Sequence, residues 1–76
     1  MNDMDNKIEI SIVVPVFNEV SLIEELVSRL KVVCDKLDQP YEIVIVDDGS
    51  SDGSHEKLKL IQAKESALRI VKLTRN

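Results

Sequence analysis

The stretch Ile43-Val44-Ile45-Val46-Asp47-Asp48-Gly49-Ser50-Ser51-Asp52-Gly53-Ser54 (residues 43–54) decides the fold of this chain. Four β-branched residues lead directly into two carboxylates, a glycine and a cluster of hydroxyl side chains. An unbroken apolar run is typical of a strand in a parallel sheet that is buried on both faces. The polar continuation predicts a turn with several candidate helix caps. Because ligands of open α/β sheets bind outside the carboxyl ends of the strands, this order of residues indicates a ligand site.

The segments on either side complete a βαβαβ pattern. Strands are expected over residues 8–16, 41–46 and 69–74, with Pro15 ending the hydrogen-bond ladder of the first. A first helix is expected up to residues 38–40, with Ser21 and Glu24 forming a capping box at its start. A second helix is expected over residues 54–64, with Leu58 and Ile61 facing the core and Leu60 fitting that face less well. The first helix carries apolar residues at helical spacing: Leu22, Ile23, Leu26, Val27, Leu30, Val33, Cys34 and Leu37.

Right-handed crossovers place these three strands in one parallel sheet, in the order 3-2-1. The expected fold class is therefore α/β, a Rossmann-like unit of three parallel strands. Residues 1–7 are polar and are expected to form a disordered tail, which leaves residues 8–76 as the folded part.

Size and composition narrow the possible functions. The 76 residues form one small domain, and 43% hydrophobic with 32% charged residues is typical of a soluble globular chain. The net charge of −4 gives no basic patch, so neither nucleic acid nor direct membrane contact is expected. No apolar run approaches the roughly 20 residues of a membrane span. The single cysteine, Cys34, is expected in the core and fits a reducing cytoplasm.

The residues at the strand ends allow two interpretations. Asp47 and Asp48 can accept hydrogen bonds from a base or a ribose hydroxyl, or they can merely cap the turn; the residues alone leave these alternatives open. Residues 15–19 follow the neighbouring strand and offer polar groups to the same crevice, or form only a turn before a helix. Arg75 lies just past the third strand, where it can reach a phosphate or be simply part of the chain end.

Other site classes find little support. His55 has no second His or Cys near it in the sequence, so a zinc site is not expected. We expect His55 to be exposed on the first turn of the second helix. Neither Gly-x-Gly-x-x-Gly nor Gly-x-x-x-x-Gly-Lys-Ser/Thr occurs, which argues against dinucleotide oxidoreductases and P-loop NTPases. A phosphoacceptor receiver domain needs a further Asp and a Lys on later strands, which this sequence does not contain.

Two motifs together resemble a known family. Val13-Val14-Pro15-Val16-Phe17-Asn18-Glu19 and the run from Glu42 to Ser54 are similar to the start of family 2 glycosyltransferases, above all the dolichyl- and undecaprenyl-phosphate sugar transferases. Leu73-Thr74-Arg75-Asn76 also resembles the segment after the third strand there. The resemblance covers residues 8–76. It implies the N-terminal part of a GT-A fold, a nucleotide diphosphate sugar as donor, and a divalent metal, Mg or Mn, in the full-length enzyme.

The resemblance also implies roles for single residues. Asp48 would hydrogen-bond the base with Asp47 beside it, Pro15 and the adjacent backbone would flank the base, and Arg75 would approach the nucleotide. The nucleotide-binding residues implied in this way are Pro15, Val16, Phe17, Glu19, Asp47, Asp48, Gly49 and Arg75.

The sequence also departs from the family pattern. The family's Asp-x-Asp metal motif has no counterpart before Asn76, and the acceptor-binding half is missing. We therefore expect a donor-binding fragment that is inactive alone and holds no metal itself. The alternative is a non-catalytic α/β module without a ligand. In either case the exposed edge of the sheet predicts a homo-oligomer.

Overall fold

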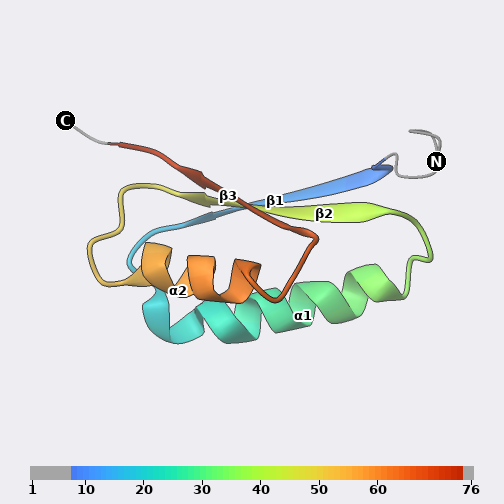
Figure 1. Ribbon diagram of the computed structural model, residues 1–76, viewed down its shortest axis with the longest axis horizontal. Helices are drawn as coiled ribbons and strands as arrows, with labels where there is room; N and C mark the ends of the chain where they lie inside the picture. Colours follow the sequence, from blue (N-terminus) through green and yellow to red (C-terminus); the bar gives the residue numbers. More distant parts are fainter. Residues whose placement is uncertain (1–7, 75–76) are drawn as a thin grey trace.

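In a computed structural model, residues 8–74 form one three-stranded parallel sheet and two α-helices (Figure 1). The strands lie in the order β1-β2-β3, so the predicted order 3-2-1 and the α/β class are confirmed. The predicted tail, residues 1–7, and Arg75 lie outside the described residues. The elements are β1 (Ile10–Val16), the 3-10 turn η2 (Val20–Leu22), α1 (Ile23–Asp35), β2 (Tyr41–Asp47), α2 (Ser54–Gln62) and β3 (Leu68–Lys72).

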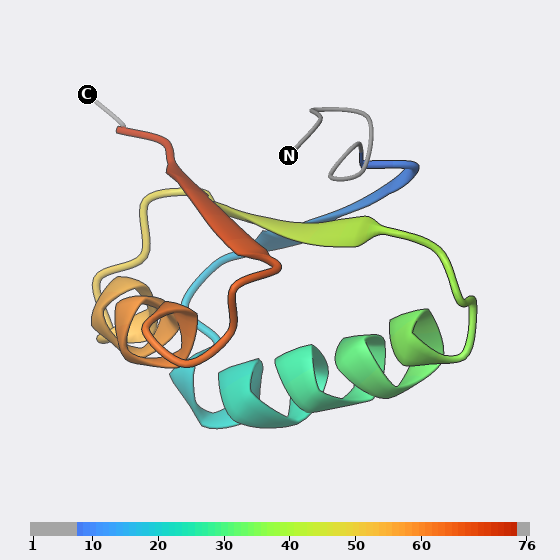
Figure 2. The same ribbon diagram turned by 45° about the vertical axis from the view of Figure 1, so that its right-hand side comes forward.

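Both helices cover the same face of the sheet (Figure 2). This follows from the strand order, because two right-handed crossovers that advance in one direction put both helices on one side. Burial along β2 alternates as a result: Ile43 and Ile45 are buried beneath the helices, whereas Val44 and Val46 are only partly covered. The expectation that this strand is buried on both faces is therefore wrong for the described residues.

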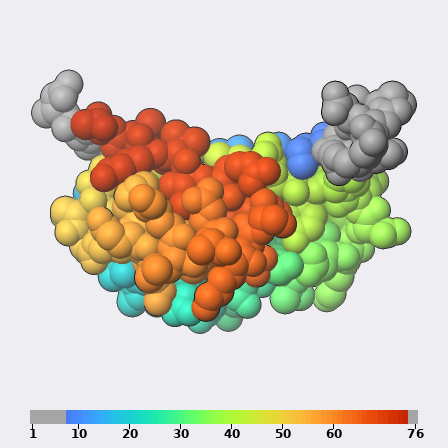
Figure 3. Space-filling model, viewed as in Figure 1, coloured from blue at the N-terminus to red at the C-terminus, as the bar shows by residue number. Residues whose placement is uncertain are grey.

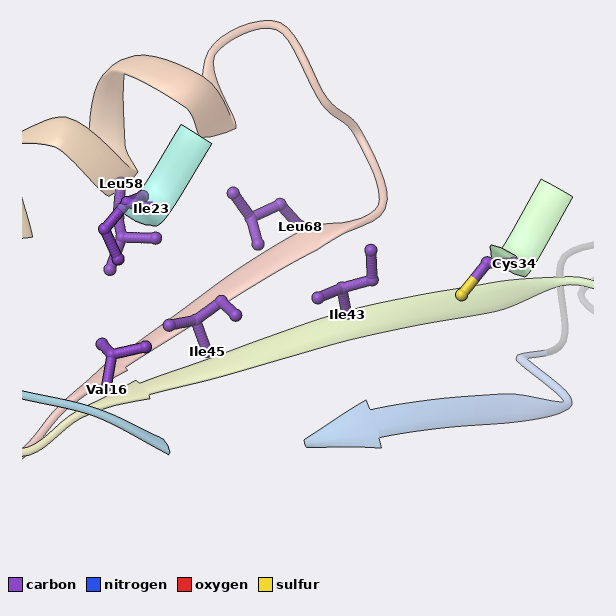
Figure 4. Close-up of a cluster of buried hydrophobic side chains, with 7 residues drawn as sticks. All are labelled: Val16, Ile23, Cys34, Ile43, Ile45, Leu58 and Leu68. Carbon is purple, nitrogen blue, oxygen red and sulfur yellow. The ribbon is translucent and has the colours of Figure 1, made fainter. Parts of the chain in front are cut away.

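The core lies between the sheet and the two helices (Figure 4). Leu58 of α2 and Ile45 of β2 are both 0% exposed, and Cys34 is buried as predicted. The side-chain cluster drawn there comprises Val16, Ile23, Cys34, Ile43, Ile45, Leu58 and Leu68. Figure 3 shows α2 and β3 packed side by side over the front of the molecule.

The apolar stripe predicted for the first helix is only partly buried. Ile23, Val27 and Cys34 face the core, but Leu22 and Val33 are each 55% exposed. A sheet of three strands covers a narrow strip of a helix, so residues at the sides of the stripe stay in solvent. In the second helix, Leu58 is buried, Ile61 packs against the core and Leu60 is exposed, as predicted.

Several predicted boundaries shift by a few residues. The helix α1 ends at Asp35 and not near residue 38, and Asp38 has a left-handed backbone with φ of 54°. Pro15 does not end the ladder, because it lies inside β1 opposite Val46. This strand is at the edge of the sheet, where a residue without an amide hydrogen is tolerated.

Candidate functional site

The carboxyl ends of β1 and β2 lie next to each other and bring together the two motifs singled out from the sequence (Figure 1). Val16 is the register partner of Asp47, and the amide of Asp48 donates to the carbonyl of Val16 at 2.9 Å. The loop of residues 17–19 therefore starts beside the loop of residues 48–53. Pro15, Phe17 and Glu19 are exposed at this end of the sheet, and Asp48 and Gly49 are partly exposed there.

Side-chain hydrogen bonds join the two loops. The amide of Asn18 donates to Ser50 Oγ at 2.9 Å, and the amide of Ser51 donates to Asn18 Oδ1 at 2.8 Å. Asn18 adopts a left-handed backbone with φ of 49°, a conformation that asparagine tolerates better than most residues. Asn18 thus links the loops through both its backbone and its side chain.

A second set of hydrogen bonds connects the later loop to the start of η2. Ser54 Oγ accepts from the amide of Glu19 at 3.1 Å, and Asp52 Oδ2 accepts from the amide of Val20 at 3.1 Å. Ser54 Oγ also donates to Asp52 Oδ1 at 2.6 Å. We call these four cross-loop residues, Asn18, Ser50, Asp52 and Ser54, the loop clasp.

The clasp replaces the predicted capping box. Neither η2 nor α1 has a side-chain hydrogen bond at its N-cap, so the expected contact between Ser21 and Glu24 is wrong. Amides at the start of a helix need acceptors, and here the neighbouring loop supplies them. The hydrogen bond from Ser54 holds the pKa of Asp52 below its ordinary value of 3.8.

The two adjacent carboxylates occupy different environments. Asp47 is 0% exposed and its Oδ1 accepts from the amide of Ser50 at 2.9 Å, so it supports the turn from below. Asp48 is partly exposed at the rim of the same turn. Gly49 follows with φ of 83°, a conformation that suits glycine, so the chain can turn directly after Asp48.

His55 lies differently from the expectation. Its side chain is only 21% exposed, and its Nδ1 lies 3.8 Å from Asp47 Oδ2. This proximity could not be predicted from the sequence, because Asp47 and His55 are eight positions apart and meet only after the chain has turned into α2. His55 does lie in the first turn of this helix as predicted, but the prediction that it is exposed there is wrong.

The remaining candidates complete the rim of the site. Glu19 is exposed, and its Oε1 accepts from the amide of Phe17 at 3.2 Å. Phe17 itself is 50% exposed. The rim therefore combines a carboxylate, a flat apolar ring and a glycine turn beside Asp48. Such a surface can accept hydrogen bonds from N–H and O–H groups of a ligand while an apolar contact holds its ring.

A groove separate from the strand ends lies on the helical layer. It has a volume of about 370 Å³ and runs between α1 and α2. Ion pairs cross it, from Lys57 Nζ to Glu24 Oε1 at 2.8 Å and from Lys31 Nζ to Glu65 Oε1 at 3.4 Å. Exposed pairs of this kind stabilise a fold only slightly. No helix within residues 8–74 is long and apolar enough to cross a membrane.

Comparison with known proteins identifies the family of this chain over nearly its whole length. The sequence profile of Glycosyl transferase family 2 matches residues 11–76. Two relatives are undecaprenyl-phosphate 4-deoxy-4-formamido-L-arabinose transferases, from Aeromonas hydrophila subsp. hydrophila and from Yersinia enterocolitica serotype O:8. Each is 43% identical over 77 residues, which covers 100% of this chain but only 23% and 24% of the respective relative. The chain belongs to glycosyl transferase family 2.

Proposed function

We propose that this chain supplies the donor-binding part of an enzyme that transfers a sugar from a nucleotide diphosphate sugar to a polyprenyl phosphate. Membership of family 2 supports the transferase class. The printed names of the two relatives, both undecaprenyl-phosphate sugar transferases, support the lipid phosphate as acceptor. The single observation that carries the site is the 2.9 Å bond between Asp48 and Val16, which places the two motifs side by side.

We assign the base to Asp48. Its carboxylate lies at the rim and can accept a hydrogen bond from a ring N–H of the base. The buried Asp47 acts indirectly, because its Oδ1 accepts from the amide of Ser50 and so stabilises the turn. Pro15, Phe17 and the backbone of Val16 would flank the base, since the side chain of Val16 is buried in the core. Glu19 and Gly49 would line the same crevice. Arg75 remains a proposed nucleotide contact outside the described residues.

The diphosphate of the donor sets a further requirement. It brings negative charge next to several carboxylates, so a cation must offset the repulsion. The family resemblance implies Mg or Mn for the full-length enzyme. Within residues 8–74, no group of three His, Cys, Asp or Glu side chains could hold a metal ion. We propose base and ribose contacts for these residues, and we expect no sugar transfer by this chain alone.

An NMR titration with UDP and with GDP tests the proposed function. We expect amide shifts confined to residues 16–19 and 48–50, with no matching shifts in the loop between α1 and β2, at the opposite end of the sheet. The nucleotide that gives the larger shifts would identify the base. If neither nucleotide at millimolar concentration moves these amides, the proposed donor site is wrong.

A second property follows from the sheet face opposite the helices. On that face Val13 is 60% exposed, Val71 44% and Leu73 45%. We propose that two copies of the chain associate through this face or through the edge of β1. Light scattering should detect a dimer, and Val13→Lys should shift the chain towards monomer. Lys59→Glu, on the helical side, should leave the association unchanged, and a monodisperse monomer of the unaltered chain at high concentration would contradict it.

A further inference from the structure

Two buried polar atoms in the described part of the chain have no hydrogen-bond partner, and they face each other. They are Asp47 Oδ2 and His55 Nδ1, 3.8 Å apart. Buried polar atoms in native proteins are nearly always hydrogen-bonded, so an orphaned pair at this distance calls for an explanation. The two orphans together indicate one bond that the side chains can form with each other.

The geometry leaves little room for another partner. Asp47 is 0% exposed, so bulk water does not reach its carboxylate. A single bridging water with two bonds of about 2.8 Å would separate the two atoms by roughly 4.5 Å, more than the observed spacing. A shift of the imidazole ring by about 1 Å brings Nδ1 within direct hydrogen-bond distance of Oδ2.

The chemistry of the pair then fixes the tautomer of the ring. A carboxylate only accepts hydrogen bonds, and a neutral imidazole carries its single hydrogen on one of its two nitrogens. For the bond to form, this hydrogen must lie on Nδ1. The ring is then held in one orientation in the first turn of α2.

We infer that His55 is a positioning residue, which donates its Nδ1–H to Asp47 Oδ2 and thereby fixes the turn of residues 48–50. Asp47 passes the constraint on, because its Oδ1 accepts from the amide of Ser50 at 2.9 Å. Ser50 Oγ in turn accepts from the amide of Asn18, in the other loop. A chain of three hydrogen bonds thus leads from His55 to both loops. The consequence for nucleotide binding rests on the proposed function; the bond itself does not.

Matched variants separate this role from simple packing. An asparagine places its amide nitrogen near the position of Nδ1, whereas a glutamine places it near the position of Nε2. His55→Asn therefore retains a donor to Asp47, and His55→Gln removes it while keeping a polar side chain of similar size. We expect amide exchange of Ser50 to become about tenfold faster in His55→Gln, and to stay within about twofold of the unaltered chain in His55→Asn.

The ¹⁵N spectrum of the imidazole in the unaltered chain provides the decisive readout and needs no variant. Hydrogen on Nδ1 supports the inference, and hydrogen on Nε2 alone overturns it. Equal exchange of Ser50 in the Asn and Gln variants also overturns it. Titration with UDP and GDP keeps the two proposals apart: if neither nucleotide shifts an amide while Nδ1 carries the hydrogen, the donor site fails and the role of His55 stands.

Discussion

Replacing Ser54 by alanine tests whether the loop clasp holds this end of the molecule together. Ser54 is 0% exposed, and its hydroxyl makes two hydrogen bonds, from the amide of Glu19 at 3.1 Å and to Asp52 Oδ1 at 2.6 Å. Ser54→Ala leaves the part-buried amide of Glu19 without its acceptor. A lost partner of this kind costs about 1–3 kcal/mol of unfolding free energy.

The control lies three residues away. Ser51 is exposed and contributes to the clasp only through its backbone amide, so Ser51→Ala keeps the bond to Asn18. We expect Ser51→Ala to change the unfolding free energy by less than about 0.5 kcal/mol. For a domain of this size, about 2 kcal/mol lowers Tm by roughly 8–16 °C, which thermal unfolding followed by circular dichroism resolves easily. If both variants melt at the same temperature, the clasp does not stabilise the fold and the reasoning is refuted.

Two further predictions concern acid stability and the core. Because Ser54 lowers the pKa of Asp52, the ionised carboxylate contributes stability that is present above the ordinary value of 3.8 and is lost as pH falls through and below it. Urea unfolding at pH 5 and pH 3 should show a smaller loss of midpoint in Asp52→Asn than in Asp38→Asn, and equal losses would contradict this assignment. Leu58→Ala should lower the unfolding free energy by about 2–5 kcal/mol, whereas Leu60→Ala, at a side chain 68% exposed, should change it little. Similar losses in both leucine variants would show that the packing of α2 is wrongly assigned.

The sequence predicted the fold well where one rule dominated. Apolar runs marked the three strands, and the handedness of crossovers then allowed only one strand order. Burial on both faces of β2 was wrong because the apolar run does not reveal whether anything covers its second side. The burial of the apolar stripe of α1 was overestimated for a related reason: the spacing of Leu22, Val33 and Leu37 fits a helical stripe, but a narrow sheet buries only its centre.

The meeting of the two motifs at one end of the sheet was predicted, but the hydrogen bonds between their loops were not. That Asp48 and residues 15–19 share one end of the sheet followed from parallel pairing alone. The hydrogen bonds of Asn18, Ser50, Asp52 and Ser54 could not be predicted, because each depends on how two loops meet in space. The long polar run after Asp48 indicated many side chains that can accept hydrogen bonds from backbone amides. It did not show that these amides belong to the other loop. The burial of Asp47 likewise depends on which way the last residue of β2 points.

The most direct test of the donor site compares UDP affinity, or GDP affinity if that nucleotide binds better, in Asp48→Asn and Asp38→Asn. Both changes remove one negative charge, and asparagine suits the left-handed backbone of Asp38, at the other end of the sheet. If Asp48 binds the base, Asp48→Asn should weaken binding about tenfold in an NMR titration, because a bond to a charged acceptor is lost. Asp38→Asn should leave the dissociation constant unchanged. Equal affinities in the two variants would contradict the central claim that the nucleotide is bound where β1 and β2 end.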